Sequence, residues 1–377
     1  MLKNEFITVL RENLSSLPEE DLERVLDYYS EIIDDCMEDG MTEEEATAEI
    51  GSVQEAIANV FSANPSKISE ETIEKNNTAV LNNPSYNGAQ FSSILVEERE
   101  SDVVLIPSAN GLTDVEWHEK LPHTAEVING VLTIRREDKR RLGFFMFGMV
   151  NEDAKLRITV PAGKYHELHI TTASGDVTIP HVFSFETADV HSASGDIEFM
   201  APVDNDLHVK STSGDVSVDK LTASIAEIGS VSGDVEIDRI KTNGGLKVKT
   251  VSGDLNVRDS DCGEFTAKTV SGDLKLDVVR CKDCTAESVS GDVSATAVIA
   301  SSVLRIVSMS GDVKLNGCDG GEVAIRTASG SVRGSLLTGK TFHCTSRSGS
   351  ISAPAPTPGG KCEVSTISGS IRLNVGN

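Results

Sequence analysis

The chain has 377 residues, of which 38% are hydrophobic and 25% charged, an ordinary composition for a soluble globular protein. Its formal net charge of −25 argues against nucleic-acid binding, because contact with phosphates needs a basic surface. No stretch approaches the roughly 18–20 apolar residues that cross a bilayer, and the acidic, amphipathic N-terminus lacks the features of a signal peptide. We therefore expect a cytoplasmic protein without a membrane-spanning segment.

The first 62 residues show helical periodicity and form an acidic head, since residues 1–75 hold 20 acidic and 5 basic residues. One helix is expected over 2–14 and a second between Pro18 and Gly40. Two shorter helices begin at the capping boxes of Thr42 and Ser52. The apolar positions of the two longer helices are Leu2, Phe6, Val9, Leu10, Leu14, Leu22, Val25, Leu26, Tyr29, Ile32, Ile33 and Cys36. The pattern predicts an α-helical bundle over 1–62 that binds a protein partner.

The next two segments differ in composition. Residues 63–88 are rich in Pro, Asn and Ser with little apolar periodicity, and we interpret them as a polar linker. Residues 89–170 carry short apolar runs at strand spacing, such as Ile94–Val96 and Val103–Ile106. These runs predict a β-rich N-terminal cap.

Residues 171–377 form an internal repeat with a period of 19 or 20 residues. Ser-Gly-Asp begins at positions 174, 194, 213, 232, 252, 271, 290 and 310, and Ser-Gly-Ser at 329, 348 and 368. Each repeat holds two segments of alternating apolar residues; in the coil that starts at Ser213 these run from Val216 to Val231. One coil buries too little to fold alone, so neighbouring coils must stack. We predict a mainly β protein whose C-terminal half is a parallel β-solenoid of about ten coils.

The repeated turn is interpreted as structural. Its glycine is expected in a backbone conformation closed to other residues, and a hydroxyl stands two residues before each Ser, which predicts a ladder of stacked hydroxyls. Stacked aspartates repel each other, so either turn N–H groups and hydroxyls or bound cations must offset the charge. With one aspartate per coil, a structural turn is preferred to a calcium site. The aspartates are Asp176, Asp196, Asp215, Asp234, Asp254, Asp273, Asp292 and Asp312.

Few residues in the repeat suit catalysis. Residues 171–377 contain no Trp or Tyr to hold a sugar ring, and the aspartates do not converge in pairs. His166 and His169 are expected on opposite faces of a strand, and the CxxC of Cys281 and Cys284 is a weak signal for metal or redox chemistry. A basic stripe on one outer face indicates either a solvated face or a site for an anionic partner. Its residues are His208, Lys210, Lys247, Lys249, Lys268, Arg305 and Arg326. We expect no enzyme, no cofactor and no metal.

A basic segment beside aromatic residues stands out in this acidic protein. Its candidate interaction residues are Arg135, Arg136, Lys139, Arg140, Arg141, Phe144, Phe145 and Phe147. Two roles fit: the phenylalanines plug the open end of the solenoid core, or the segment contacts a partner or a membrane surface.

The last coil is expected to end the rod. Pro354, Pro356 and Pro358 cannot donate ladder hydrogen bonds, so they would prevent end-to-end association of rods.

Two resemblances cover nearly the whole chain. Residues 90–377, with VEERESDVVLIP, LRITVPAGKYHELHITTASGDVTI and the SGD repeats, resemble the bacterial putative-adhesin family of unknown function, which implies a β-solenoid without established catalytic activity. Residues 1–62, with LSSLPEEDLERVLDYYSEIIDD and EIGSVQEAIANVF, resemble the HAAS helical domain, which implies a signalling role. We expect a non-enzymatic scaffold in intracellular signalling or an envelope response. The alternatives are a surface adhesin and, third, a carbohydrate-active enzyme.

Overall fold

The computed structural model describes residues 90–118, 121–137 and 154–376 continuously, together with 79–80 and scattered positions between residues 3 and 47. The chain divides into two compact units: residues 1–77 with 139–148, and residues 78–138 with 149–377. In the first unit, the described positions Phe6, Leu26 and Ile33 are helical and buried, as members of the apolar stripes should be. Most of the predicted bundle and most of the predicted linker lie outside the described residues.

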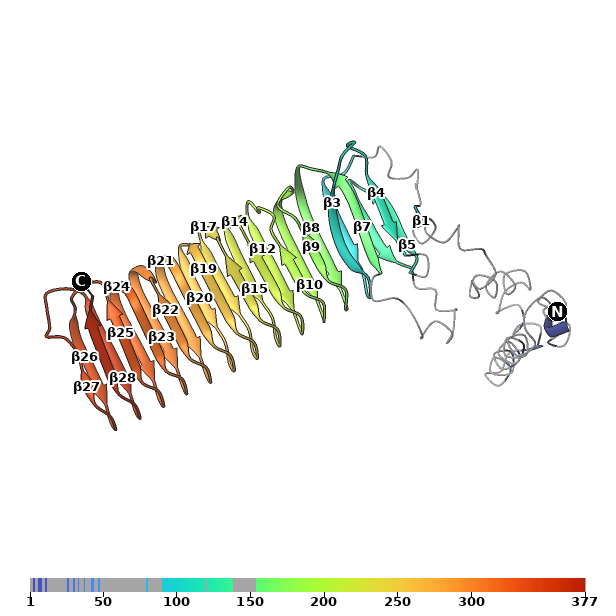
Figure 1. Cartoon of the computed structure of the whole chain (residues 1–377). Coiled ribbons are helices and arrows are strands. Elements are labelled where there is room, and N and C mark those ends of the chain that lie inside the picture. Colours follow the sequence, from blue (N-terminus) through green and yellow to red (C-terminus); the bar gives the residue numbers. More distant parts are fainter. Residues whose placement is uncertain are drawn as a thin grey trace, which may run out of the picture. The chain divides into compact units, whose positions relative to one another are not determined.

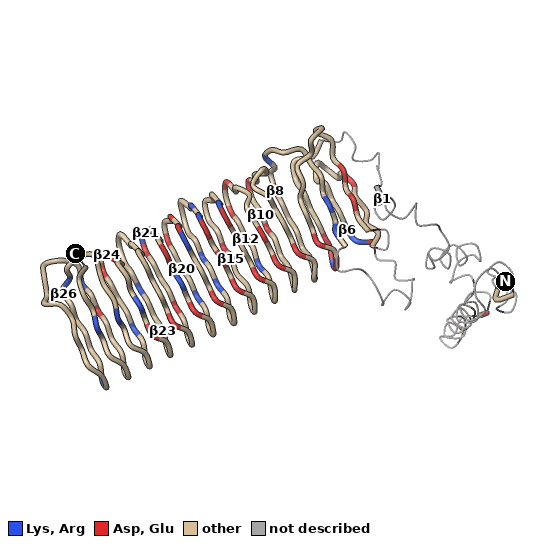
Figure 2. Tube along the Cα trace, viewed as in Figure 1, with Lys and Arg blue, Asp and Glu red and all other residues tan. Residues whose placement is uncertain are grey.

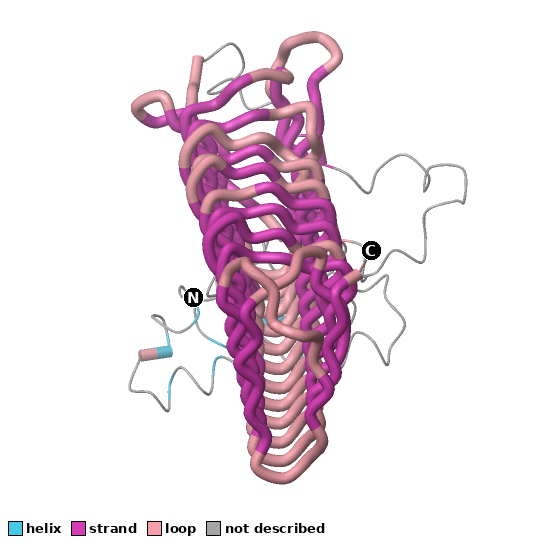
Figure 3. The backbone as a smooth tube through the Cα atoms, turned by 90° about the vertical axis from the view of Figure 1, so that its left-hand side faces the viewer, coloured by secondary structure: helices cyan, strands magenta, loops and turns pink. Residues whose placement is uncertain are grey.

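The second unit is a parallel β-solenoid, which confirms the predicted fold class (Figure 1). Seen along its length, two walls of strands enclose the core and meet at a column of turns (Figure 3). In spatial order, the first wall consists of β5 (His123–Ile128), β6 (Val131–Arg136), β2 (Ser93–Glu97), β8 (Lys164–Thr172), β10 (Ser184–Ser192), β12 (Asp206–Ser211), β15 (Ile225–Gly229), β18 (Gly245–Lys249), β20 (Glu264–Lys268), the second half of β21 (Leu274–Ser288), β23 (Ile299–Ser308), the second half of β24 (Val313–Thr327), β28 (Lys361–Thr366) and β26 (Thr341–Ser346).

In each SGD coil, the chain passes from the first wall through the turn into a strand of the second wall. The second wall consists of β1 (Ala79–Val80), β4 (Asp114–Trp117), β7 (Lys155–Pro161), β3 (Asp102–Ser108), β9 (Val177–Ile179), β11 (Ile197–Phe199), β13 (Val216–Asp219), β16 (Val235–Asp238), β19 (Leu255–Asp261), the first half of β21, β22 (Val293–Thr296), the first half of β24, β25 (Val332–Leu336), β29 (Ile371–Val375) and β27 (Ile351–Ser352). The short β14 (Thr222–Ala223) and β17 (Lys241–Thr242) pair with each other away from the turn column.

The core is filled by the alternate side chains of each strand. Val216, Val218, Ala226 and Ile228 of one coil are at most 1% exposed, and the next coil repeats the pattern. The prediction was wrong at one position of the repeat: Val231 and Val251, both expected inward, are 45% and 43% exposed. The preceding residue is a hydroxyl that faces the core instead, which turns the valine outward. The same position in later coils forms an exposed apolar ridge of Val251, Val270, Val289 and Met309.

At both ends of the rod, the spatial order of coils differs from their order in the sequence. The first coil, β2–β3, lies between β6–β7 and β8–β9. The last coil, β28–β29, lies between β24–β25 and β26–β27. The rod therefore extends beyond the SGD repeat on its N-terminal side, and the first and last coils in the sequence each have two neighbours.

The expected C-terminal end is corrected by this order. The outermost coil is β26–β27, and Pro354, Pro356 and Pro358 belong to the connection that carries the chain from β27 back to β28. Lys340, only 5% exposed, holds the outer coil to its neighbours: its Nζ lies 2.8 Å from Asp319 Oδ1 and donates to the Gly320 carbonyl at 2.7 Å. The prolines therefore lie in a return connection, and β26 presents the free strand edge.

The N-terminal end of the core is covered by antiparallel strands. β5 pairs with β6, and β4 pairs with β7. Trp117 of β4 and Ala125 of β5 are buried side chains of this cover, and the Trp117 ring centroid lies 5.6 Å from that of His123. Described residues thus supply a cover for the core, while the proposed plug of Phe144, Phe145 and Phe147 lies outside the described residues. In the described part of the chain, no helix is long and apolar enough to cross a membrane.

Candidate functional site

The turn column joins each coil to the next through its glycine and its hydroxyl. Ser211 Oγ accepts the Gly214 N–H at 2.9 Å and donates to the Gly195 carbonyl of the preceding coil at 3.2 Å. Ser230 repeats both contacts with Gly233 and Gly214. Hydroxyls of most later coils donate to a turn glycine in the same way, which confirms the predicted hydroxyl ladder.

The turn needs glycine because the backbone of the neighbouring turn leaves no room for a Cβ atom. The prediction that this glycine adopts a backbone conformation closed to other residues was wrong. None of the SGD glycines has a positive φ. A Cβ on Gly253 would instead lie 2.0 Å from the carbonyl oxygen of Gly233, far inside van der Waals contact. The turns stack so closely that no side chain fits between them.

The SGD aspartates form a second ladder beside the first. The backbone N–H of Asp196 donates to Asp176 Oδ1 at 2.8 Å, and Asp215 donates to Asp196 at 2.7 Å. The same contact continues coil by coil to Asp312, whose Oδ1 accepts the Ser331 N–H. Each carboxylate is thus hydrogen-bonded to the following turn, which lowers the cost of stacking like charges.

Basic side chains neutralise the C-terminal part of this aspartate ladder. Lys314 Nζ lies 2.9 Å from Asp292 Oδ2, and this hydrogen bond holds the pKa of Asp292 below its usual value. Arg333 pairs with Asp312. Among the described residues, no group of three His, Cys, Asp or Glu side chains is arranged to hold a metal ion.

The aspartate ladder starts at a turn that lacks the Ser-Gly-Asp sequence. The Asp176 N–H donates to Asp102 Oδ1 at 3.1 Å, so Asp102 is its first member. In the same turn Glu98 takes the place of the hydroxyl, because its Oε1 accepts the Ser101 N–H at 2.9 Å. The signal was present in the sequence: Glu98 precedes Asp102 by four residues, as Thr172 precedes Asp176.

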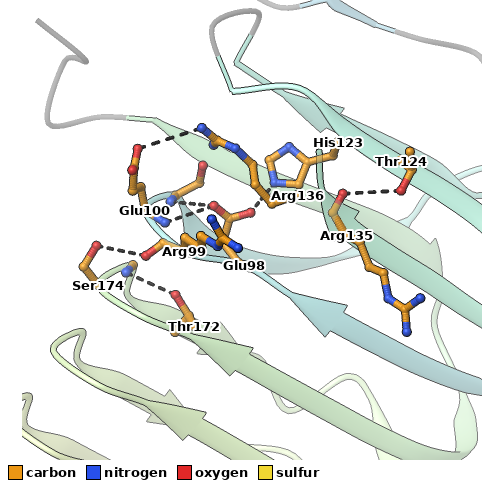
Figure 4. Close-up of polar contacts among 11 residues, drawn as sticks. Glu98, Arg99, Glu100, His123, Thr124, Arg135, Arg136, Thr172 and Ser174 are labelled. Atoms are coloured by element: carbon orange, nitrogen blue, oxygen red, sulfur yellow. Dashed lines mark hydrogen bonds and ion pairs between the residues drawn. The ribbon is translucent and has the colours of Figure 1, made fainter. Parts of the chain in front are cut away.

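Glu98 also forms a buried ion pair with His123 of β5 (Figure 4). Both side chains are inaccessible, and since a carboxylate only accepts, His123 Nε2 donates to Glu98 Oε2. Burial raises the pKa of Glu98, but the hydrogen bond and charge of His123, with the turn N–H groups, outweigh it and lower the pKa to about 2. His123 Nδ1 is buried without a hydrogen-bond partner among the described residues. The pair locks the capping hairpin onto the first coil.

We expect the Glu98→Gln variant to be less stable than the wild type by roughly 3 kcal/mol at pH 7. A carboxyl whose pKa falls from 4.5 to about 2 on folding stabilises the native state above pH 4.5, and this contribution disappears as the pH falls to about 2. In urea titrations, the difference in unfolding free energy between wild type and variant should therefore be present at pH 5 and disappear as the pH falls to about 2. Glu100→Gln, an exposed neighbour, is the control. A gap independent of pH would contradict the assignment.

Two of the eight candidate interaction residues are described, and both are paired. Arg135 Nε lies 3.0 Å from Glu97 Oε2. One nitrogen of Arg136 lies 3.9 Å from Glu100 Oε2 (Figure 4). The other terminal nitrogen of Arg136 is buried without a described partner. Both pairs lie at the corner where the basic segment leaves β6. Lys139, Arg140, Arg141, Phe144, Phe145 and Phe147 lie outside the described residues.

The histidine prediction was wrong. His166 and His169 both point outward, because Tyr165 and Leu168 point inward and two consecutive outward residues separate them. His166 Nδ1 lies 2.8 Å from Glu186 Oε2, and His169 Nδ1 lies 3.5 Å from Asp189 Oδ2. Each histidine thus faces an acid of the next coil.

The CxxC cysteines belong to the core. Cys281 and Cys284 are both buried, and Cys262 of the preceding coil contacts Cys281. A register shift between Cys281 and Asp283 lets both cysteines face inward. The hydrogen bond to Cys281 and burial both raise the pKa of Cys284 well above its usual value, which suits a thiol that packs as a small apolar side chain.

The basic stripe is interleaved with acids. Lys247 Nζ lies 3.1 Å from Glu227 Oε1, and Lys268 Nζ lies 2.6 Å from Glu287 Oε2. Figure 2 shows both signs of charge alternating along the rod. Most of this face therefore has the character of a solvated, ion-paired surface.

Several solved structures are similar to this chain. A putative adhesin from Bacteroides fragilis NCTC 9343 is 14% identical with a TM-score of 0.28, the match covering 76% of this chain and 93% of that one. A putative adhesin from Parabacteroides distasonis ATCC 8503 is 13% identical, with a TM-score of 0.36 and coverage of 66% and 94%. A putative lipid binding protein from the same organism is 17% identical, with a TM-score of 0.36 and coverage of 65% and 93%. The comparison with curated proteins gives no match.

Two family models match different parts of the chain. Residues 5–59 match the HAAS model. Residues 91–264 and 258–377 match the model described as Toastrack DUF4097, and together these segments cover well over half of the chain. The chain belongs to the Toastrack DUF4097 family.

Proposed function

We propose that this protein is a non-enzymatic interaction scaffold in an intracellular signalling or envelope-response pathway. The observation that carries the proposal is the unbroken hydrogen-bonded column from Asp102 to Ser370, which makes the rod a rigid element. The turn aspartates belong to this column, and several other charged side chains form ion pairs between coils. Partner binding is assigned to residues 1–62, which match HAAS over 5–59, and to the basic segment after β6.

In-cell photo-crosslinking of the full chain tests the proposal. A photoreactive residue would replace Tyr28 in the head, Phe144 in the basic segment or, as a control, Lys275 on the rod. We expect Tyr28 and Phe144 to capture one and the same protein, and Lys275 to capture none. Cross-links from the rod alone, to cell-surface polysaccharide, would favour a surface adhesin and overturn the assignment.

A further inference from the structure

In one coil, the last residue of the first-wall strand is a glycine, so an outward side chain is missing beside the turn column. Lys210, Gly229, Lys249 and Lys268 follow one another in register on β12, β15, β18 and β20. An open groove of about 450 Å3 runs from Thr171 and His191 past Gly229 to Lys249, and Lys210 and Val231 also line it. This volume falls within the ordinary range of small-ligand sites.

The backbone of the next coil prevents any side chain at position 229. A Cβ on Gly229 would lie 2.6 Å from the carbonyl oxygen of Lys249, so close stacking leaves room for glycine alone. Because neighbouring strands are about 4.8 Å apart, the lysines on either side stand roughly 10 Å apart, near enough for both to reach one bound group. Val231 of the apolar ridge and Thr212 form the rim on the turn side.

The gap has an excess of positive charge. Glu227 is shared by Lys247 at 3.1 Å and Lys210 at 3.9 Å. Lys249 forms no ion pair with a described carboxylate, and the neighbouring Lys247 and burial, with Lys268, lower its pKa. Lys210 and Lys249 against Glu227 leave the lining with a formal charge of +1, the sign that attracts a phosphate group.

We propose that the Gly229 gap binds the phosphate group of a small ligand, held between the ammonium groups of Lys210 and Lys249. Lysines on flexible stems with a hydroxyl on the rim suit a tetrahedral phosphate. The net charge of −25 repels a long polyanion, so a single phosphate group fits better than a nucleic acid.

Calorimetric titration of the full chain with glycerol phosphate at low ionic strength is the direct test. We expect Lys249→Gln and Lys210→Gln to weaken binding at least tenfold. Lys268→Gln, in the same column but paired with Glu287 and outside the gap, should change it less than twofold. Glu227→Gln should strengthen binding, because it removes the competing carboxylate. All four changes are on the surface, and circular dichroism checks the fold.

A second experiment distinguishes the sources of the phosphate. Cosedimentation with phosphatidic acid vesicles, against phosphatidylcholine vesicles, reports a lipid headgroup, whereas heat with glycerol phosphate alone reports a soluble ligand. Either result supports the site if Lys249→Gln abolishes it. Equal losses in Lys249→Gln and Lys268→Gln, or binding to neither probe, would overturn the proposal.

Discussion

Replacing Gly253 with alanine is expected to destabilise the rod by at least about 3 kcal/mol. The new Cβ would lie 2.0 Å from the Gly233 carbonyl oxygen and 2.9 Å from the Asp234 nitrogen, so the backbones of two coils would have to separate. Separating the two coils would break the hydrogen bonds before and after Gly253 in the sequence. Thr250 Oγ1 donates to the Gly233 carbonyl, and the Asp254 N–H donates to Asp234 Oδ1.

Urea unfolding followed by circular dichroism measures this cost, and hydrogen exchange locates it. The matched control is Gly245→Ala, where the nearest atom to the added Cβ is 3.8 Å away, so a change below about 1 kcal/mol is expected. Protection should fall first in the turns next to Gly253. Equal stability of the two variants would show that the turns can move apart freely.

The second large effect distinguishes the two coils at the C-terminal end. Ile371→Ala is expected to cost about 2–5 kcal/mol, as for a buried isoleucine, while Ile351→Ala should cost less than about 1 kcal/mol. Ile371 is 1% exposed because its coil lies between Val332 and Ile351, whereas Ile351 in the outer coil is 45% exposed. Coils stacked in sequence order would reverse this ranking, since Ile371 would then lie on the end.

Hydrogen exchange of peptides spanning 361–375 measures the result, because the end coils of a solenoid can open without global unfolding. Ile371→Ala should speed exchange in β28 and β29. Faster exchange in Ile351→Ala than in Ile371→Ala would show that the final coil is outermost after all.

The rod was predictable because the repeated turn imposes its own geometry. A glycine that no other residue can replace, followed by an aspartate that accepts from the next turn, recurs every 19 or 20 residues, so the period is visible without an alignment. Val231 was misplaced because an apolar residue was expected to point inward. At this position the core accepts Ser230 instead, since its hydroxyl bonds Gly233 and Gly214.

The spatial order of the coils and the contacts between distant side chains were harder to predict. The last three turns are spaced as regularly as the others, so nothing local shows that β28–β29 lies inside β26–β27; pairing between distant segments decides it. The Glu98–His123 pair joins residues 25 apart through a hairpin that strand periodicity does not place. The gap at Gly229 was likewise hidden, because a missing side chain matters only when the coils around it are in register.

The two inserted coils also determine how the rod would respond to tension. A terminal coil with one neighbour opens row by row when its end is pulled, because only one set of hydrogen bonds carries the force at a time. Here the first coil, β2–β3, and the last, β28–β29, are each bonded on both sides. Pulling on β2 or on β29 must therefore break two rows of hydrogen bonds together, so these coils resist extension as a coil in the interior of the rod does.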